Sequence, residues 1–401
     1  MRNITVESLD KTPVENQAVE LVERKGVGHP DSICDAIMEE VSVSLCREYI
    51  KTFGRVVHHN IDKGLLVAGK TTPRIGGGKV EEPMRLVFGD RAIYEFKGKK
   101  VPVGEIAIAT AQEWLRKNLR FVDPTAHIVF QNEIKPGSPE LTDIFDREVI
   151  GANDTSAAVG YAPLTETERI VLATERYLNS PEFKKAFPES GEDIKVMGYR
   201  RYRELILTVA MAFVDRFVPS EKAYFARKAE IKAMIEQFVA NEKRNFDKVT
   251  VDLNTLDVEG RGEDGMYLTV LGTSAEGGDC GQVGRGNKVN GVIALNRPMS
   301  TEAAAGKNPI AHVGKIYTFL THFIADDIYQ HVPGIAEVYV WLCSQIGQPI
   351  DKPLIASAQL VLKPGVHLED VRKPVEEVIE NELANIYQFT ERLTHGEFSV
   401  W

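Results

Sequence analysis

Residues 26–31 read Gly-Val-Gly-His-Pro-Asp, and Asp35 follows one helical turn later. Glycines let a backbone approach a bound group closely, and Pro30 suits the first position of a helix because its φ is already helical. Asp31 and Asp35 then share one face near the start of that helix. A histidine and a carboxylate at such a turn suit a phosphate and metal site, with His29 touching a leaving group. The alternative is a Gly-Pro turn whose aspartate only caps a helix.

A second segment with possible chemistry covers residues 275–288, which read A-E-G-G-D-C-G-Q-V-G-R-G-N-K. Its glycines can expose consecutive backbone N–H groups, which form a concavity that binds anions. Arg285 adds a planar donor fork suited to phosphate, and Asp279 can accept from a sugar hydroxyl or an ammonium group. The alternative is a long hairpin loop whose charges are simply solvated.

The third segment, residues 303–315, reads A-A-A-G-K-N-P-I-A-H-V-G-K. Lys307 follows a glycine at the entrance to a periodic helix, where the helix dipole and free amides favour negative charge. His312 and Lys315 follow within the next two turns. An ordinary helix cap with a solvated lysine is the alternative.

Helices and strands that alternate along the chain must position these segments. Apolar residues at helical spacing predict helices over 31–51, 105–118, 165–178, 181–186, 220–243, 310–330 and 368–393. Alternating or β-rich runs predict strands over 56–68, 126–131, 203–213, 248–252, 266–273, 292–295, 336–342 and 354–362. This alternation predicts an α+β protein with helices on one face of each sheet.

Residues 64–71, G-L-L-V-A-G-K-T, match the P-loop pattern formally. A P-loop needs a helix that starts at its Lys-Thr pair. Here Leu65 to Ala68 read as strand interior, and Pro73 and three glycines follow Thr71, so no helix is expected. The sequence favours a strand over a P-loop.

Composition narrows the class of protein. The chain has 401 residues, 43% of them hydrophobic, and a net charge of −10, which argues against nucleic acid or an anionic membrane as partner. The four cysteines lack the spacing of a zinc site or disulfide framework. Residues 1–17 do not read as a targeting signal, and the longest apolar run, 205–214, is too short to cross a bilayer. We therefore expect a cytoplasmic protein.

Taken in order, the three segments resemble the methionine adenosyltransferase (S-adenosylmethionine synthetase) family, in its archaeal type. The resemblance extends over essentially the whole chain. It implies that methionine sulfur attacks C5′ of ATP and displaces triphosphate, which is then hydrolysed to pyrophosphate and phosphate. The sulfur of the thioether attacks without deprotonation, so no side chain has to act as a nucleophile. The protein must instead orient two substrates and neutralise the leaving group.

The resemblance also assigns roles to individual positions. His29 corresponds to the histidine at the oxygen between C5′ and the α-phosphate, and Asp31 to an aspartate that binds Mg²⁺. Arg285 and Lys307 correspond to cations that bind the triphosphate. Acidic positions that the resemblance places around ATP and methionine are Glu23, Asp154 and Asp279. A gate loop over the site corresponds to Pro136, Gly137, Ser138, Pro139, Glu140 and Leu141.

Some positions depart from the bacterial and eukaryotic pattern. Ser32 and Gly286 stand where a lysine is usual, with Lys288 the nearest replacement for the second. His312 is the nearest candidate for the residues expected after Gly-Lys. Asp62 is the candidate for a second Mg²⁺ ligand, and K⁺ is a possible further cofactor. Arg200 and Arg201 are candidates for the missing positive charge.

The family fold implies three similar sheet-plus-helix subdomains around a pseudo-threefold axis, interleaved in sequence. Approximate divisions fall at residues 1–130, 131–270 and 271–401. The resemblance further implies a homodimer with active sites at the subunit interface, and ATP and L-methionine as substrates. The alternative from another class is a nucleotide-binding regulatory protein that has lost turnover.

Overall fold

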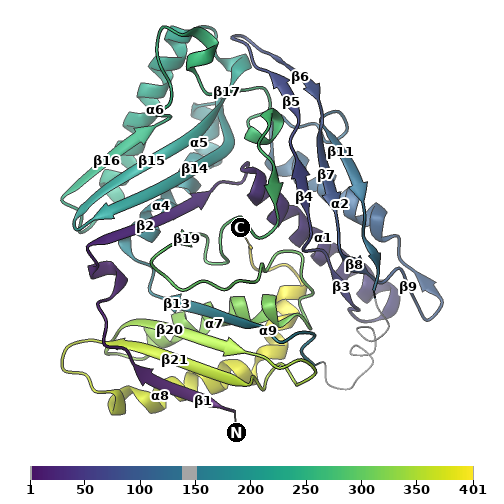
Figure 1. Ribbon diagram of the computed structural model, residues 1–401, viewed down its shortest axis with the longest axis vertical. Coiled ribbons are helices and arrows are strands. Elements are labelled where there is room, and N and C mark those ends of the chain that lie inside the picture. Colours follow the sequence, from purple (N-terminus) through teal and green to yellow (C-terminus); the bar gives the residue numbers. More distant parts are fainter. Residues whose placement is uncertain (1, 138–150, 401) are drawn as a thin grey trace.

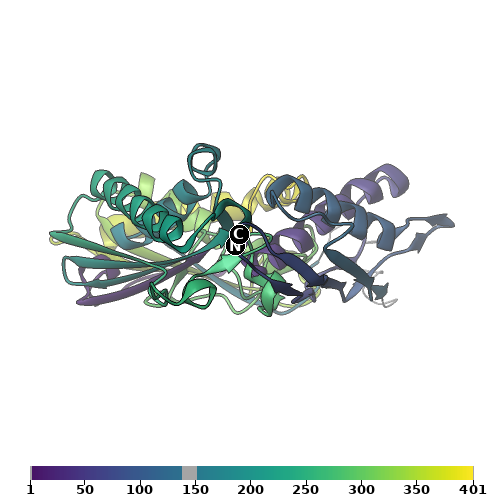
Figure 2. The same ribbon diagram turned by 90° about the horizontal axis from the view of Figure 1, so that it is seen from above.

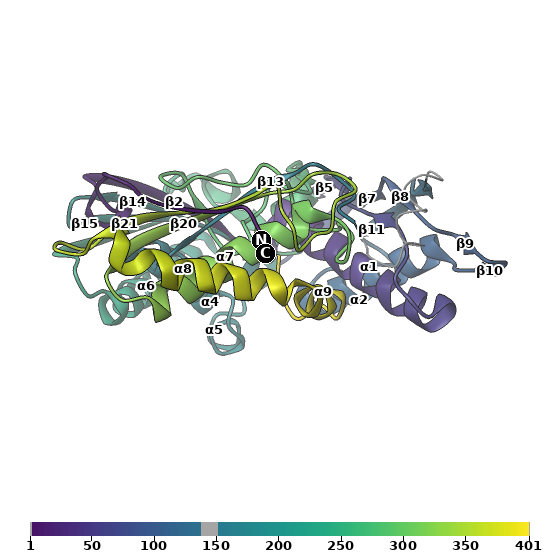
Figure 3. The same ribbon diagram turned by 90° about the horizontal axis from the view of Figure 1, so that it is seen from below.

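The computed structural model describes residues 2–137 and 151–400. In this part of the chain, sheets surround the centre of the molecule (Figure 1), and the main helices lie on one side of them (Figures 2 and 3). The α+β class and the placement of helices on one face are therefore confirmed. No helix among the described residues is long and apolar enough to span a membrane.

The first sheet has the strand order β1-β21-β20-β13. It consists of β1 (Ile4–Ser8), β13 (Ala157–Ala162), β20 (Ile335–Cys343) and β21 (Ile355–Leu362). β1 runs parallel to β21, and the other pairs are antiparallel. The helices that pack on it are α7 (Val313–His331) and α8 (Leu368–Ala384), which is followed by α9 (Ile386–Thr394).

The second sheet has the order β16-β15-β14-β2-β19, with β17 also paired to β15. Its strands are β2 (Val19–Lys25), β14 (Ser190–Arg201), β15 (Glu204–Val214), β16 (Lys248–Leu253), β17 (Leu268–Thr269) and β19 (Ile293–Ala294). The helices of this region are α4 (Glu166–Leu178), α5 (Pro181–Ala186) and α6 (Glu221–Glu242). A capping box between Thr165 and Glu168 starts α4.

The third sheet has the order β11-β7-β4-β18. It consists of β4 (Leu65–Val67), β7 (Met84–Phe88), β11 (Ile128–Asn132) and β18 (Gly281–Gln282), under α1 (Pro30–Phe53) and α2 (Val103–Asn118). Smaller sheets pair β3 (His59–Asn60), β8 (Arg91–Ala92) and β12 (Lys135–Pro136), β5 (Lys70–Thr72) with β6 (Lys79–Glu82), and β9 (Glu95–Phe96) with β10 (Lys99–Lys100). Short 3₁₀ turns cover Val14–Asn16, Asp215–Phe217, Gly262–Gly265 and Ser274–Gly277.

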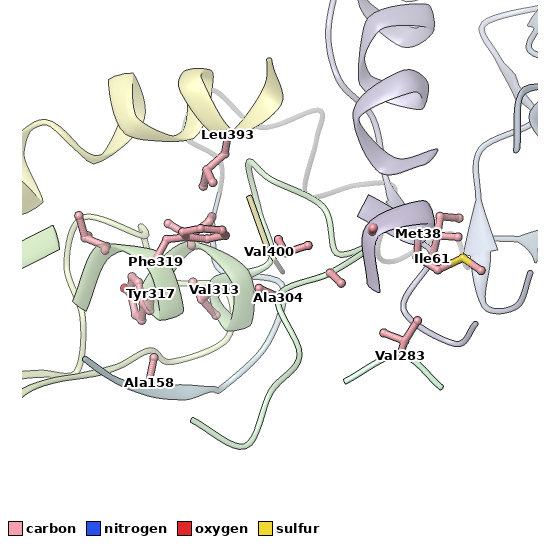
Figure 4. Packing of buried hydrophobic residues seen from close by; sticks show 14 of the residues in the cluster. Met38, Ile61, Ala158, Val283, Ala304, Val313, Tyr317, Phe319, Leu393 and Val400 are labelled. Carbon is pink, nitrogen blue, oxygen red and sulfur yellow. The ribbon is translucent and has the colours of Figure 1, made fainter. Parts of the chain in front are cut away.

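Burial of apolar side chains ties these layers together. One core joins α1 and α2 to α7 and the first sheet, and another lies beneath the second sheet. In Figure 4, Met38 of α1 lies beside Ile61, and Tyr317 and Val313 of α7 lie over Ala158 of β13. Phe319 extends from the other side of α7 toward Leu393 of α9. Helices α1 and α7, which bury this core, also carry the polar side chains of the candidate functional site.

The structure differs from the predicted elements at several places. The strand predicted over 56–68 is broken into β3 and β4, because the backbone of Ile61 instead donates to Gly306 at 2.8 Å. The helix predicted over 368–393 is interrupted at Asn385, whose side-chain amide donates to the carbonyl of Asn381 at 2.9 Å. Of the strand predicted over 266–273, only β17 is present, and β1, β2, β13 and β14 were not predicted.

The rejection of a P-loop is confirmed. Lys70 lies in β5, not at the start of a helix, and its ammonium is 3.3 Å from the carboxylate of Glu81 on β6. The two strands form a hairpin whose backbone is used for pairing. No cradle of free amides is therefore available around Lys70.

Candidate functional site

Helix α1 carries a buried polar stripe toward its N-terminal half. Asp31, Asp35, Glu39 and Ser42 follow one another at spacings of three or four residues, and all four are buried. Each accepts or donates a hydrogen bond to a loop that lies far away in the sequence. One helix therefore fixes the position of both glycine-containing segments singled out in the sequence.

The first two carboxylates hold the glycine-rich loop. Asp31 accepts from the amide of Gln282 at 2.9 Å, and Asp35 accepts from the amides of Gly284 at 2.8 Å and Gly286 at 3.1 Å. The two amides on Asp35 flank Arg285, so that its backbone is held from both sides. Burial raises the pKa of Asp35 to about 7, although these two amide donors oppose the shift.

Close contact between this loop and the start of α1 requires glycine at two positions. A Cβ on Gly281 would lie 2.1 Å from the carbonyl oxygen of Pro30, and one on Gly286 would lie 2.2 Å from the Asp35 carboxylate. Side chains at these positions would push the loop away from the helix. The predicted convergence of the Gly-His-Pro-Asp turn and the glycine-rich loop is thus present in the structure.

His29 is the N-cap of α1. Its Nδ1 accepts from the amide of Asp31 at 3.2 Å, so in the neutral ring the proton is on Nε2. Burial lowers the pKa of His29 below 6.5, against the opposing charges of Asp193 and Asp31. The ring is therefore neutral at pH 7 and has one N–H left to donate.

Charged groups from β2 and β14 line the approach to this turn. The ammonium of Lys25 lies 2.9 Å from the Asp31 carboxylate and donates to the carbonyl of Arg285 at 2.6 Å. Glu23 is 3.2 Å from the ammonium of Lys195 and 3.8 Å from that of Lys25. Glu23 therefore lies beside Lys25, the residue that binds Asp31.

Two aspartates face each other through Ser274. Asp193, which is buried, accepts from the Ser274 amide at 2.8 Å and hydroxyl at 2.5 Å, and Asp279 lies 3.2 Å from the same hydroxyl. Burial raises the pKa of Asp193, and the two hydrogen bonds from Ser274 oppose this shift. Asp279 therefore lies near the Gly-His-Pro-Asp turn, where the sequence placed it.

Of the basic residues in the glycine-rich loop, Arg285 is exposed and Lys288 is half-buried. The side chain of Arg285 has no hydrogen-bonding or ion-pair partner among the described residues. Burial lowers the pKa of Lys288, whose nearest opposing charge is Asp35. Arg285 is thus free to bind an anion above the loop.

A second cluster surrounds Lys307. Its ammonium hydrogen-bonds the carboxylate of Asp62 and lies 3.1 Å from Glu302. Asn60 donates to Asp62 at 3.0 Å and to Asp90 at 3.1 Å. Burial would raise the pKa of Asp62, but the charge of Lys307 holds it well below the usual value, whereas burial and Asp62 raise the pKa of Asp90 to about 6.

Below this cluster, a buried ion pair supports the loop that carries Lys307. Both oxygens of Glu39 lie 2.7 Å from the ammonium of Lys315, and one of them also accepts from the amide of Gly306 at 3.0 Å. His312 is the N-cap of α7 and accepts from the amide of Gly314 at 3.2 Å. Burial lowers the pKa of His312 to about 3, so its ring is also neutral.

The remaining predicted residues lie at the edge of these clusters or outside the described residues. Asp154 accepts from the Thr155 amide at 2.7 Å, and the adjacent Asn153 amide donates to Ala311 at 3.1 Å, beside His312. Gly137 lies against His58. Pro136 is in β12, whereas Ser138, Pro139, Glu140 and Leu141 lie outside the described residues.

Comparison with known proteins identifies the family. The sequence profile described as S-adenosylmethionine synthetase (AdoMet synthetase) matches residues 2–397. The chain belongs to the S-adenosylmethionine synthetase family. It is 48% identical to the S-adenosylmethionine synthase of Pyrococcus furiosus and 47% identical to that of Methanothermobacter thermautotrophicus, each over 100% of both chains.

A solved structure supports the same fold at low sequence identity. An S-adenosylmethionine synthetase from Campylobacter jejuni, described as unusual, matches with a TM-score of 0.62 and 14% identity. The match covers 94% of this chain and 90% of that one. This match supports the fold, whereas the sequence profile and the two relatives confirm the resemblance to the S-adenosylmethionine synthetase family noted in the sequence.

One expectation for a member of this family is wrong. Arg200 cannot supply positive charge to a substrate, because it is 3% exposed and bound to Glu20 at 2.8 Å and to the carbonyls of Gln17 and Val14. Two cations that were not predicted, Lys25 and Lys195, lie beside Asp31 and Glu23 instead. Each lysine follows an acidic residue two positions earlier along a strand, as in Glu23-Lys25 and Asp193-Lys195. This spacing is the feature of the sequence that could have indicated them.

Proposed function

We propose that this member of the S-adenosylmethionine synthetase family makes S-adenosyl-L-methionine from ATP and L-methionine. Methionine sulfur attacks C5′ in line, and triphosphate leaves as a unit and is hydrolysed to pyrophosphate and phosphate. The observation that carries this proposal is the convergence on α1 of the His29 turn, the Arg285 loop and the Lys307 loop. These loops offer one neutral N–H donor and two cations to a polyanionic leaving group.

His29 has the properties needed at the bridging oxygen. Because its Nδ1 is occupied by the Asp31 amide, its Nε2–H can donate to the oxygen between C5′ and the α-phosphate. That hydrogen bond strengthens as negative charge develops on the oxygen, which lowers the barrier. No base is required, because the attacking sulfur carries no proton.

Arg285 and Lys307 are proposed to hold the triphosphate. The guanidinium of Arg285 presents several donors from a loop clamped by Asp35, and Lys307 supplies a compact charge at the opposite loop. Lys288 and His312 add donors beside them. Glu23, Asp154 and Asp279 are proposed to bind the ribose or the methionine ammonium.

The residues present fit divalent cations bound mainly by substrate. Mg²⁺ is usually held by one or two carboxylates together with phosphate oxygens. No group of three or more His, Cys, Asp or Glu side chains in the described residues could hold a metal alone. Asp31 fits as a ligand, and at Asp62 the buried Oδ1 of Asn60 has no hydrogen-bond partner and could add an oxygen. Mg²⁺ would neutralise phosphate charge, and we propose K⁺ as a further ion.

A homodimer with active sites at its interface is part of the proposal. On the face of the second sheet away from its helices, Tyr199 on β14 pairs with Leu21 on β2 and Ile206 on β15. Tyr199 and Ile206 are exposed, which is a feature of sheets that pack against another copy. We also propose the approximate threefold relation of the subdomains and the divisions at residues 130 and 270. Sedimentation as a monomer at assay concentration would contradict the dimer.

One assay tests the reaction. Purified protein with Mg²⁺, ATP and L-methionine is expected to yield equal amounts of S-adenosylmethionine, pyrophosphate and phosphate, all dependent on methionine. Lys307→Ala and Arg285→Ala should each lower turnover about 10²- to 10³-fold. Unchanged kinetics in both variants would refute their assignment.

The histidine role has its own test. His29→Asn should reduce sulfonium formation more than hydrolysis of added triphosphate, since only the first step needs a donor at the bridging oxygen. Equal losses would refute the role. ATP binding without methionine-dependent products would instead indicate a regulatory protein. Release of ADP, abolished by Lys70→Ala, would indicate a P-loop enzyme.

A further inference from the structure

A large basic cavity lies beside the Gly26–Gly28 turn, with Val27 in its lining. The helices α2, α4 and α5 that contribute to it lie on the helical side of the molecule (Figure 3). Its volume is about 840 Å³, and it lies between the C-terminal ends of α2 and α4, the segment that begins α5, and β14. Basic side chains that line it are Arg24, Lys117, Arg120, Arg176, Lys184 and Lys185. His29, Arg285 and Lys307 do not line it, so it is separate from the candidate active site.

Among the described residues, two carboxylates, those of Glu175 and Glu192, line the same cavity, and both are already bound to arginines. Glu175 accepts from Arg24 at 2.5 Å, and Glu192 accepts from Arg120. Lys184 is buried and donates to the carbonyl of Gly191 at 2.7 Å. These pairings account for three of the six cations.

The other three cations are not held in ion pairs, although the carboxylate of Glu175 exerts an opposing charge on Arg176. Lys117 and Lys185 are exposed, as is Arg176, and none of them has a hydrogen-bonding or ion-pair partner in the described part of the chain. They come from three separate elements, α2, α4 and α5. Three unpaired positive charges around one hollow, in a chain of net charge −10, create a local field that attracts anions.

We propose that this cavity binds a small inorganic anion with two or more linked phosphate groups. A cavity of about 840 Å³ with cations from three elements suits an anion that carries charge at more than one phosphate. Arg176 offers a bidentate fork, and the lysines offer point charges. Among the described residues, no aromatic side chain lines the cavity, so none of them would stack on a nucleobase. Phosphate alone is therefore the recognised chemistry.

The cavity shares its wall with the His29 turn. Val27 lines it, and the flanking amides of Gly26 and Gly28 donate to Ile194 at 2.6 Å and to Glu192 at 3.0 Å. Glu192 also binds Arg120 through its side chain. An anion in the cavity would thus contact residues bonded directly to the turn that ends in His29.

Calorimetric titration with inorganic pyrophosphate tests the proposal. The titration uses the full chain carrying Arg285→Ala and Lys307→Ala, so that binding at the candidate active site is removed. We expect one remaining site per chain, weakened at least tenfold when Arg176→Gln and Lys185→Gln are added. The matched control adds Arg116→Gln and Lys222→Gln, two exposed cations outside the cavity, and should change the dissociation constant less than twofold.

Absence of a remaining site, or equal weakening by the control pair, would overturn the proposal. A parallel titration with ADP distinguishes the source of the phosphate. Similar affinities for pyrophosphate and ADP are expected, and tenfold tighter binding of ADP would overturn recognition of phosphate alone. Unchanged thermal unfolding of the Arg176→Gln, Lys185→Gln protein excludes misfolding. Because Arg285 and Lys307 are already replaced, failure of the proposed reaction would leave this result unaffected.

Discussion

The buried pair of Glu39 and Lys315 should be essential to the loop that carries Lys307. Lys315 is fully buried, and its ammonium lies 2.7 Å from both oxygens of Glu39. Lys315→Met keeps the length of the side chain but leaves a buried carboxylate without its counter-charge. Removal of one partner of such a pair typically costs about 3–5 kcal/mol. We expect a loss of that size in the free energy of unfolding.

A second substitution distinguishes the effect of the buried charge from that of the hydrogen bond to Gly306. Glu39→Gln in the Lys315→Met background removes the buried charge and keeps an oxygen that can accept from the Gly306 amide. Loss of that amide bond alone would cost about 1–3 kcal/mol, so its retention matters. The double variant should therefore recover at least half of the stability lost in the single variant, with a coupling energy of about 2–3 kcal/mol.

Urea unfolding at fixed protein concentration measures these values, with turnover as a second readout. Lys373→Met is the matched control, because Lys373 is exposed and its contact with Glu377 spans 3.8 Å, so its loss should cost less than about 1 kcal/mol. The reasoning is refuted if Lys315→Met costs no more than this control. It is also refuted if the double variant is no more stable than the single one.

Two further predictions follow from the same loops. Gly281→Ala should lower kcat/KM about 10²-fold, because its Cβ would lie 2.1 Å from the Pro30 carbonyl oxygen and displace the loop. The control Gly277→Ala should be nearly neutral, because its Cβ would meet nothing within 3.7 Å. Equal kinetics of the two variants would contradict the close contact at Gly281. Burial lowers the pKa of His59 to about 3, so below pH 6.5 the unfolded chain takes up a proton there that the folded chain does not. The stability advantage of wild type over His59→Gln should hence shrink by about 2 kcal/mol between pH 7.5 and 5, and a constant difference in urea titrations would disprove it.

The sequence predicted the helices well, because their apolar residues repeat at helical spacing along α1, α2, α4, α6 and α7. It missed β2 and β14 because charged side chains occupy their buried face. Arg24 and Arg200 are both 3% exposed, and Glu20 is 1% exposed and bound to Arg200. Sequence patterns place charged side chains on the exposed face of a strand, so the buried face of such a strand is predicted as the exposed one. The buried charges are stable because they are paired with residues from other elements.

The candidate site was predictable where its residues lie in short glycine-containing segments, as for His29, Asp31, Asp279, Arg285 and Lys307. The pairing of Lys307 with Asp62 was not, since 245 residues separate them. Asp193 escaped prediction for the same reason: it lies close to Ser274 because β15 pairs both with β14, which carries Asp193, and with β17, which precedes Ser274. The spacing of residues in the sequence indicates neighbours within one helix, strand or loop. Neighbours that are distant in the sequence follow from the order of the strands in each sheet.

The pairing of β1 with β21 has a consequence for how the chain is made. β1 comprises residues Ile4–Ser8 and its parallel partner comprises Ile355–Leu362, so the first sheet cannot close until almost the whole chain has emerged. At roughly 5–20 residues per second, that delay is about 20–70 s. During this time the backbone N–H and C=O groups of β1 are unpaired. Those of β2 are also unpaired until β14 and β19 have been synthesised. Biosynthesis is therefore the stage at which this fold is most exposed to aggregation, and closure of the sheet by non-local contacts should be slow.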